Sequence, residues 1–306
     1  MHSKSANSTK PHLRAILLAV FVTFLWSTSW ILIKFGLRSN LPPITFAGLR
    51  YSLAFLCLIP FVARNSVQRD AFTSISLADW WRLGILGVFN YTLTQGAIFI
   101  SLAYLPAALL NLILSLTSVL VGLAGVIFLN ERPVSLQWLG VILTTAGVGM
   151  YFLPVSFQQP QVFGLIAAII AVLTNTIASS LGRQINRARK LPALIVTISS
   201  MGIGSMLMLI IGLLSQGIGK ITWQDWMIIA WLAIFNTAIA FTLWNHSLRS
   251  LSAIESSIIN SLMLPQVAIL AYIFLGEVLT YKEIAGLIMV GIGVLMVQLR
   301  REHGHG

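Results

Sequence analysis

Two stretches of the chain, DWWRLGILGVFN at residues 79–90 and DWMIIAWLAIFN at residues 225–236, begin with the same Asp-Trp pair and end with the same Phe-Asn pair. A shift of 146 residues extends this match without a gap, from residues 79–150 onto residues 225–296, with 22 identities in 72 positions. Chance similarity between apolar segments rarely keeps polar residues in register over such a length, so the chain contains an internal repeat.

Turn and glycine signals follow the same repeat. The matched groups are Phe128-Leu129-Asn130-Glu131 with Phe274-Leu275-Gly276-Glu277, Gly140 with Gly286, and Gly147 with Gly293. A shift of 149 residues aligns the earlier part of each half and places Lys34 on Arg183 and Pro43 on Pro192. The paired glycines lie seven residues apart and therefore on one helix face, where we expect them to permit close helix packing.

The composition indicates a membrane protein. Hydrophobic residues make up 57% of the chain and charged residues 9%, with a mean hydropathy of +0.89, whereas an ordinary soluble domain carries about 25% charged residues. Apolar runs of about 20 residues, long enough to cross a bilayer, recur along nearly the whole chain. The first run, from Leu13, follows a basic segment but is too long for a signal peptide.

The sequence predicts an all-α membrane protein with ten transmembrane helices. The predicted spans are 13–35, 44–63, 81–103, 106–129, 135–153, 162–183, 192–214, 226–248, 252–275 and 282–299. The repeat divides them into two five-helix units, residues 1–153 and 154–306. Because five is odd, the second unit enters the membrane from the opposite side, and such inverted repeats are typical of transporters that work by alternating access.

The basic residues predict the orientation. With a cytoplasmic N-terminus, 14 of the 19 Lys and Arg residues fall in the tails and in the even-numbered connections, as the positive-inside rule requires. We therefore expect both termini in the cytoplasm of a bacterial cell, with the chain in the inner membrane. Arg50, within the second span near its outer end, is expected to extend its head group to the surface.

The chain resembles the EamA family of the drug/metabolite transporter superfamily. The resemblance covers the whole chain and is carried by the residues that follow: Phe24-Leu25-Trp26-Ser27 and Lys34 in the first span, Leu49-Arg50 in the second, Ala103-Tyr104-Leu105-Pro106-Ala107-Ala108 opening the fourth, Ser261-Leu262-Met263-Leu264-Pro265 in the ninth, and the Phe-Leu-x-Glu turn that closes each half. Val119 replaces the family's usual proline in the fourth span, so we expect that helix to be straighter than the ninth.

The resemblance implies export of amino acids, other metabolites or drugs. In overall form and aromatic content the chain is similar to the YddG-type branch, which exports aromatic amino acids. The family's central cavity is lined mainly by the first, third, fourth, sixth, eighth and ninth helices. Export of amino acids, aromatic or otherwise hydrophobic, is therefore the expected function. The alternatives are an exporter of drugs or other neutral metabolites, or a membrane scaffold or receptor that transports nothing.

Polar and aromatic residues on these helices are the candidate substrate contacts. Amides both donate and accept hydrogen bonds, which suits a zwitterion, and tryptophan offers apolar area and attraction for an ammonium group. The alternative role of each amide is a hydrogen bond between neighbouring helices, and that of each tryptophan is an interfacial anchor. The candidates are Trp26, Trp30, Asn90, Tyr91, Gln95, Asn111, Asn175, Asn236, Trp244, His246 and Asn260.

The sequence lacks the motifs that are typical of other classes of function. The sequence contains no His-Glu-x-x-His, phosphate loop or Gly-x-Ser-x-Gly, and its single cysteine, Cys57, excludes a disulfide framework, so we expect no enzyme and no cofactor. All eight acidic residues fall in predicted loops or near helix ends, which favours movement down a gradient without obligatory proton coupling. The expected partners are a small-molecule substrate and membrane lipid, with no nucleic acid, and the expected state is a monomer.

Overall fold

The computed structural model describes residues 9–129, 135–152, 159–188, 190–248, 250–251 and 253–298, which form helices and connecting turns without a strand. The helices are α1 (Thr9–Arg38), α2 (Pro43–Ala63), α3 (Ser66–Thr73), α4 (Leu77–Gly87), η1 (Val88–Gln95), α5 (Gly96–Tyr104), α6 (Ala107–Leu129), α7 (Ser135–Phe152), α8 (Gln159–Arg187), α9 (Ala193–Gln216), α10 (Trp223–Ala233), η2 (Ile234–Ile239), α11 (Ala240–Ser247), α12 (Ala253–Ser261), α13 (Met263–Leu275) and α14 (Tyr281–Gln298). The predicted all-helical class is confirmed for this part of the chain.

Seven helical stretches of the described residues are long and apolar enough to cross a membrane. Three of the predicted spans are built from consecutive segments: α4, η1 and α5 form the third, α10, η2 and α11 the eighth, and α12 with α13 the ninth. The short helix α3 was not predicted. It begins after Asn65, whose side chain caps the backbone N–H of Gln68, and it is mostly exposed at one end of the bundle.

Both π-helical segments occupy the same place in the repeat, because the shift of 146 residues carries Val88 at the start of η1 onto Ile234 at the start of η2. Inside each segment a threonine hydroxyl donates to the carbonyl five residues earlier: Thr94 to Phe89 at 2.7 Å and Thr237 to Leu232 at 2.8 Å. A π-helical turn widens the backbone locally and occurs often at functional sites.

The ninth predicted span is interrupted, whereas the fourth is not. α12 ends at Ser261 and α13 begins at Met263, just before Pro265, whose missing N–H disrupts the helical hydrogen bonds. α6, with Val119 in place of proline, runs as one helix. The expectation that the fourth helix is straighter than the ninth is confirmed, because the fourth is continuous and the ninth is broken.

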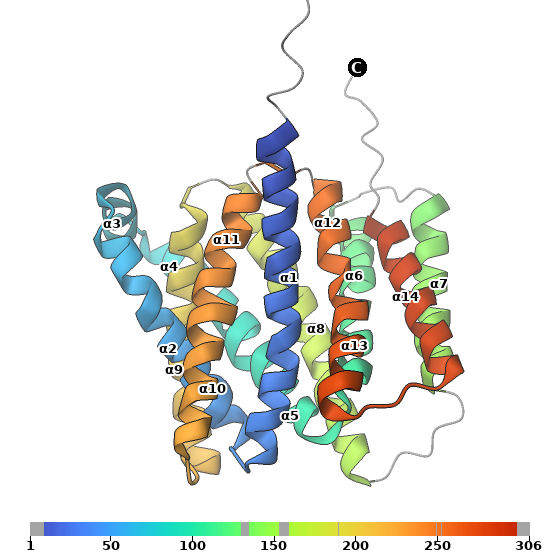
Figure 1. The fold of residues 1–306 in the computed structure, drawn as a ribbon. Coiled ribbons are helices and arrows are strands. Elements are labelled where there is room, and N and C mark those ends of the chain that lie inside the picture. The colour runs from blue at the N-terminus through green and yellow to red at the C-terminus, as the bar shows by residue number, and fades with distance from the viewer. Residues whose placement is uncertain are drawn as a thin grey trace, which may run out of the picture.

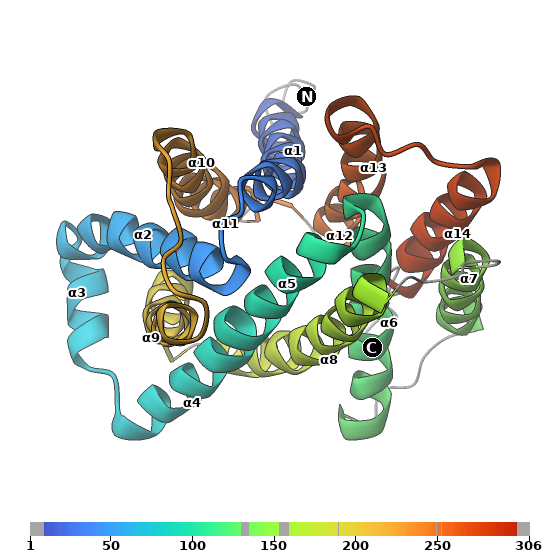
Figure 2. The ribbon, with the colours of Figure 1, turned by 90° about the horizontal axis from the view of Figure 1, so that it is seen from below.

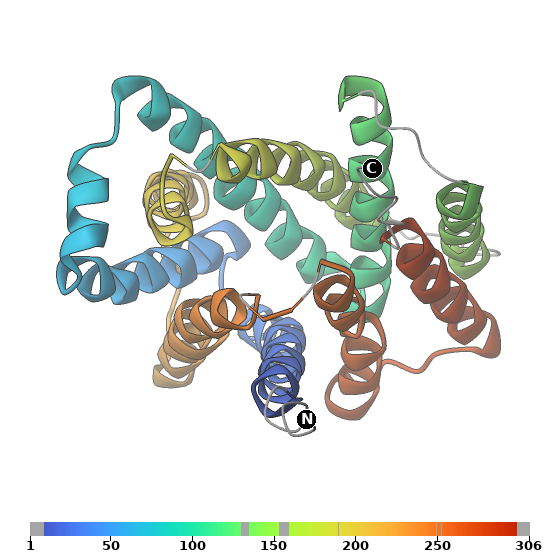
Figure 3. The ribbon, with the colours of Figure 1, turned by 90° about the horizontal axis from the view of Figure 1, so that it is seen from above.

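The repeated glycines bring α7 and α14 into backbone contact. A Cβ atom on Gly140 would lie 2.6 Å from the Gly293 carbonyl oxygen, and one on Gly147 would lie 2.8 Å from that of Gly286. Only glycine permits this approach, so the predicted role in close packing is confirmed. Figures 2 and 3 show α7 and α14 side by side at one edge of the bundle.

A second close pair, α2 and α9, lies toward the opposite edge (Figure 2). A Cβ atom on Gly48 would lie 2.6 Å from Cα of Leu209, and one on Gly212 would lie 2.7 Å from the Thr45 nitrogen. The helices α1, α5, α6, α8, α11 and α13 lie between the two pairs. In Figure 1 α1 begins and α14 ends at the same, upper end of the bundle, where α3 also lies.

Replacing Gly147 by alanine is expected to destabilise the protein by about 1–3 kcal/mol, because the added methyl group meets the Gly286 carbonyl across the α7–α14 contact. Gly149 on the same helix is the matched control, since a Cβ atom there meets nothing within 4 Å. Gly149→Ala should leave stability unchanged or raise it by up to about 1 kcal/mol. Thermal unfolding in detergent measures both variants, and a Gly147→Ala protein as stable as the wild type would contradict the packing described.

Candidate functional site

The two halves of the chain meet in the close pairs α2–α9 and α7–α14 at the edges and, in the middle of the bundle, through α1 and α8. α1 packs against α10, η2, α11, α12 and α13 of the second half, while α8 packs against η1, α5 and α6 of the first half. Most of the predicted candidate residues lie on these helices. The polar contacts between them therefore show which side chains join the halves and which remain available.

Asn236 joins η2 to α1. Its side chain is 1% exposed, and its amide nitrogen donates to the Leu25 carbonyl and, at 3.0 Å, to the Thr28 hydroxyl. Its carbonyl oxygen Oδ1 is buried and accepts no hydrogen bond among the described residues. The residue therefore links two helices through its donor group and leaves a buried acceptor unused.

The matched candidate in the first half, Asn90, is half-buried on η1, as is Gln95. Tyr91 is 4% exposed, and its ring packs edge-on against the Tyr51 ring of α2, with the centroids 5.5 Å apart. Its Cβ also lies beside Gly204 of α9. Tyr91 therefore belongs to the packing of α2 and α9 against η1.

Two further amides bridge helices around α6. Asn111 is 8% exposed and donates to the Met263 carbonyl at 3.3 Å, next to the break between α12 and α13. Asn175 on α8 is half-buried and donates to the Thr117 hydroxyl at 3.5 Å. These contacts connect α6 to one helix of the second half on each side.

The aromatic candidates form one cluster and one separate contact. Trp26 lies 5.2 Å from Trp244 and 5.6 Å from Phe241 between ring centroids, so α1 and α11 share an aromatic interface. Trp30 packs instead against the main hydrophobic core. The remaining candidates, His246 and Asn260, have exposed side chains.

Gln266 is a polar residue of the same interface that was not among the residues predicted from the sequence. From α13 its side-chain oxygen accepts a hydrogen bond from Ser27 at 2.9 Å, and its nitrogen lies 3.5 Å from the Thr23 hydroxyl. Both partners are on α1. The signal available in the sequence was its position directly after Pro265, within the interrupted ninth span.

Arg50 does not extend to the surface, so that prediction is wrong. The side chain is 5% exposed and directed inward from α2, where it lies over the Tyr51 ring, with its guanidinium carbon 4.9 Å from the centroid. It donates to the hydroxyl of Thr237 on η2 at 3.3–3.4 Å and to that of Ser29 on α1 at 3.4 Å. These inward partners explain why it does not reach the outer end of its helix.

A carboxylate of the second half caps a helix of the first. Glu277, in the Phe-Leu-x-Glu turn, accepts from the backbone N–H of Ala107 at 2.7 Å and of Ala108 at 3.1 Å, at the start of α6. Nearby, Arg38 donates to the Leu275 carbonyl at 3.3 Å. An acidic side chain at a helix N-terminus satisfies donors that the helix cannot use. Its repeat counterpart, Glu131, lies outside the described residues.

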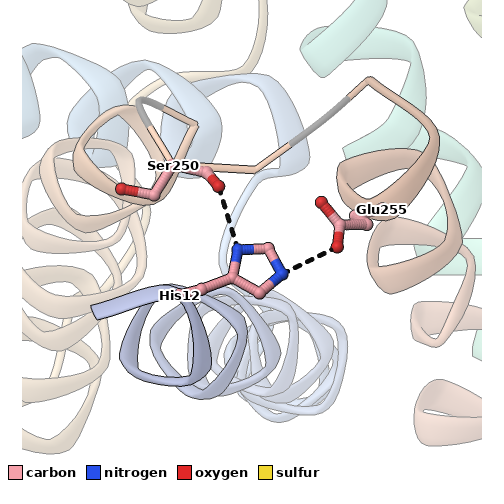
Figure 4. Close-up of polar contacts among 3 residues, drawn as sticks. All are labelled: His12, Ser250 and Glu255. Atoms are coloured by element: carbon pink, nitrogen blue, oxygen red, sulfur yellow. Dashed lines mark hydrogen bonds and ion pairs between the residues drawn. The ribbon is translucent and has the colours of Figure 1, made fainter. Parts of the chain in front are cut away.

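Figure 4 shows a polar contact at the end of the bundle where α1 begins. His12 lies between the Ser250 carbonyl, 3.1 Å from Nδ1, and a Glu255 carboxylate oxygen, 2.9 Å from Nε2. Both partners are acceptors, so both contacts are hydrogen bonds only when the ring is doubly protonated. The His12 and Glu255 side chains are 42% and 36% exposed, so their pairing contributes at most about 1 kcal/mol.

An apolar groove of about 800 Å³ lies between α12–α13 and α14. Aliphatic side chains make up most of its lining, with Ser261 and Tyr272 as its polar members. None of the predicted candidates lines it, and it offers no charged group to an ionised substrate. The groove is therefore separate from the polar contacts that join the halves.

Comparisons with known proteins agree with this architecture. The model of the EamA-like transporter family matches residues 13–153 and again residues 162–299. An uncharacterised transporter of Archaeoglobus fulgidus is 27% identical, with 94% of this chain and 99% of that protein covered. An uncharacterised transporter of Bacillus subtilis is 26% identical, with 95% and 93% covered.

A probable amino-acid metabolite efflux pump of Salmonella typhimurium is 25% identical, with 90% of this chain and 92% of that protein covered. A solved crystal structure superimposes with a TM-score of 0.67 at 18% identity and covers 94% of this chain and 97% of the other, which shows a shared fold. With its apolar helices and its transporter relatives, the chain is a multi-pass membrane protein that belongs to the EamA-like transporter family of drug/metabolite transporters.

Proposed function

We propose that this protein exports amino acids or closely related metabolites across the bacterial inner membrane by alternating access. The observation that carries this proposal is the similarity, over nine-tenths of the chain, to a protein named a probable amino-acid metabolite efflux pump. The contacts that the predicted amides and tryptophans make between the halves agree with such a substrate, because amides, hydroxyls and aromatic rings suit a zwitterion with an apolar side chain.

The proposed machinery is ten transmembrane helices in two inverted five-helix units, residues 1–153 and 154–306. The glycine contacts of α7 and α14 support it. The repeat carries Gly140 onto Gly286 and Gly147 onto Gly293. When the two halves are interchanged, the Gly140–Gly293 contact therefore becomes the Gly147–Gly286 contact, and the reverse. Reciprocal contacts of this kind are typical of a two-fold axis. The π-helical segments at matched positions support the same relation.

An inverted pair supports alternating access because each half can adopt the conformation of the other. α1 and α8 are matched helices in the middle of the bundle, and each contacts several elements of the opposite half, so we infer that the exchange acts on them. The excess of basic residues in the even-numbered connections favours cytoplasmic termini. The proposed working unit is a monomer.

The apolar surfaces of the cluster formed by Trp26, Trp244 and Phe241 favour an aromatic or aliphatic substrate side chain. An exporter of drugs or other neutral metabolites is the second candidate, and the aromatic cluster favours it equally. The two candidates differ in whether the substrate needs its ammonium and carboxylate groups. A scaffold or receptor is distinguished by the absence of any flux in proteoliposomes.

Counterflow by the purified protein against a panel of amino acids is expected to show exchange of hydrophobic and aromatic members. Trp26→Ala should lower the initial rate about five-fold, since an aromatic contact contributes about 1 kcal/mol. Trp30→Ala should have a smaller effect because the ring packs in the core. Tyr91→Ala is expected to act mainly through stability, because that ring is buried against Tyr51.

Trp81→Ala is the control for that experiment, because the Trp81 side chain is 71% exposed outside the helix contacts between the halves. Its counterflow rate should equal that of the wild type. Wild-type protein that exchanges no amino acid, in liposomes where its folding is verified, would overturn the proposed substrate class.

A pH gradient is expected to leave net substrate accumulation unchanged. Five acidic side chains that the structure describes lie at helix ends or in turns and are engaged there: Asp79 and Glu283 in capping interactions, Asp225 with Ser39 and Thr222, Glu255 with His12, and Glu277 with the start of α6. A sixth, Asp70, is exposed on α3. None is free at mid-span to carry a proton among the described residues. Uphill accumulation driven by an imposed pH gradient in proteoliposomes would contradict transport without proton coupling.

A further inference from the structure

Arg50 is a buried cation without a matching anion. Its side chain is 5% exposed, and among the described residues its hydrogen-bond acceptors are two hydroxyl groups, those of Ser29 and Thr237, at 3.3–3.4 Å. The ion pairs among the described residues are His12 with Glu255 and Asp79 with Arg82, and neither includes Arg50. The guanidinium group has five N–H donors and prefers two short, parallel bonds to a carboxylate. The contacts of Arg50 with the two hydroxyls are longer than bonds to a carboxylate, and they leave part of the guanidinium donor capacity unused.

The position of Arg50 makes this arrangement costly. Arg50 lies seven residues into α2, about 10 Å along the helix from its start. A charged side chain at membrane depth is retained where it meets a partner, a cavity or a function. Extension to the surface would relieve the cost, but the side chain points the other way, between α1 and η2. The hydroxyl contacts position the guanidinium group without neutralising it.

The Asn236 side chain, on η2 and against α1, carries a buried acceptor without a donor among the described residues. Asn236 directly precedes Thr237, the η2 residue that Arg50 contacts. Its partner Thr28 directly precedes Ser29, the α1 residue that Arg50 contacts. The Asn236 carbonyl oxygen has no described hydrogen-bond partner although the side chain is 1% exposed. The incompletely satisfied donor group of Arg50 therefore contacts η2 at Thr237, the residue that follows the incompletely satisfied acceptor Asn236.

We propose that Arg50 and Asn236 form a binding site for an α-amino carboxylate, in which the Arg50 guanidinium binds the carboxylate and the Asn236 carbonyl oxygen accepts from the ammonium group. The proposal rests on amino-acid export as the proposed function and names the groups that recognise the substrate. A carboxylate supplies the bidentate acceptor that the hydroxyls of Ser29 and Thr237 do not. The ammonium group supplies the donor that Asn236 lacks.

The site as described is closed. The bonds of Asn236 to Leu25 and Thr28, and that of Arg50 to Ser29, hold η2 and α2 against α1. A substrate that binds Arg50 competes for the same donor groups, so binding favours separation of α1 from η2. The extra width of the π-helical backbone at η2 provides an element whose hydrogen bonds can rearrange during that separation.

The site belongs to one half only. The shift of 149 residues carries Arg50 onto Ser199, which is buried and uncharged, so the matched position of the second half carries no cation. One guanidinium group matches one carboxylate. A phosphate ester with two negative charges would leave one of them uncompensated in the same place.

The first test needs only the wild-type protein in proteoliposomes. Preloaded labelled phenylalanine is exchanged against external phenylalanine, phenethylamine, which lacks the carboxylate, or 3-phenylpropanoate, which lacks the ammonium group. The proposal expects phenethylamine to compete at least ten-fold less well than phenylalanine, and 3-phenylpropanoate to fall between them. Equal competition by phenethylamine and phenylalanine would overturn it.

The second test compares Arg50→Gln and Arg50→Lys with Arg38→Gln. Arg38 is an exposed arginine with one bond to a backbone carbonyl, so its substitution should leave exchange unchanged. Arg50→Gln is expected to lower the apparent affinity for phenylalanine at least ten-fold and to remove the preference over phenethylamine, while Arg50→Lys retains part of that preference. Asn236→Ala should weaken phenylalanine binding without weakening that of 3-phenylpropanoate.

The outcomes separate this proposal from the proposed function. If the folded Arg50→Gln variant exchanges phenylalanine with wild-type affinity and preference, the site is wrong while amino-acid export stands. If the wild-type protein exchanges no amino acid, both are wrong. If Arg50→Gln does not fold, the preference retained by Arg50→Lys and the wild-type competition between phenylalanine and phenethylamine decide the question.

Discussion

Hydrocarbon offers no hydrogen bonds, so each polar side chain inside this bundle must find its partner on another part of the protein. That constraint explains why the intramembrane amides join helices. Asn236 links η2 to α1, Asn111 links α6 to the break before α13, and Gln266 links α13 to α1. The same residues that could serve a substrate therefore hold the halves together, and transport by this protein requires that substrate contacts replace helix contacts.

Packing follows a simpler rule at the edges of the bundle. Glycines let α7 meet α14 and α2 meet α9 through their backbones, which makes each pair a close unit. α1 and α8 are different, because in the middle of the bundle they contact the opposite half through side chains. We expect the close pairs at the edges to stay together during transport. The central helices are expected to exchange partners, because side-chain contacts hold them.

Much of the fold follows from the sequence because apolar length, glycine spacing and the repeat are all visible in it. Close helix packing at the repeated glycines was predicted, and so was a fourth helix straighter than the ninth. The helix α3 was missed because it is short and polar, and the π-helical segments were missed because an extra residue in a helix leaves no pattern in the sequence. The candidate site was harder, since the direction of a side chain depends on neighbours from distant segments. Arg50 illustrates this, because Ser29 and Thr237 turn it inward.

The central claim is that the two halves cross the membrane in opposite senses. It can be tested with a Cys57→Ser background that carries one new cysteine in each matched connection, at Val67 in α3 or at Ile218 between α9 and α10, where the side chains are 68% and 52% exposed. A membrane-impermeant maleimide is applied to right-side-out and inside-out vesicles. The account predicts that Val67→Cys reacts from the cytoplasmic face only and Ile218→Cys from the opposite face only. Reaction of both cysteines from the same face would contradict it.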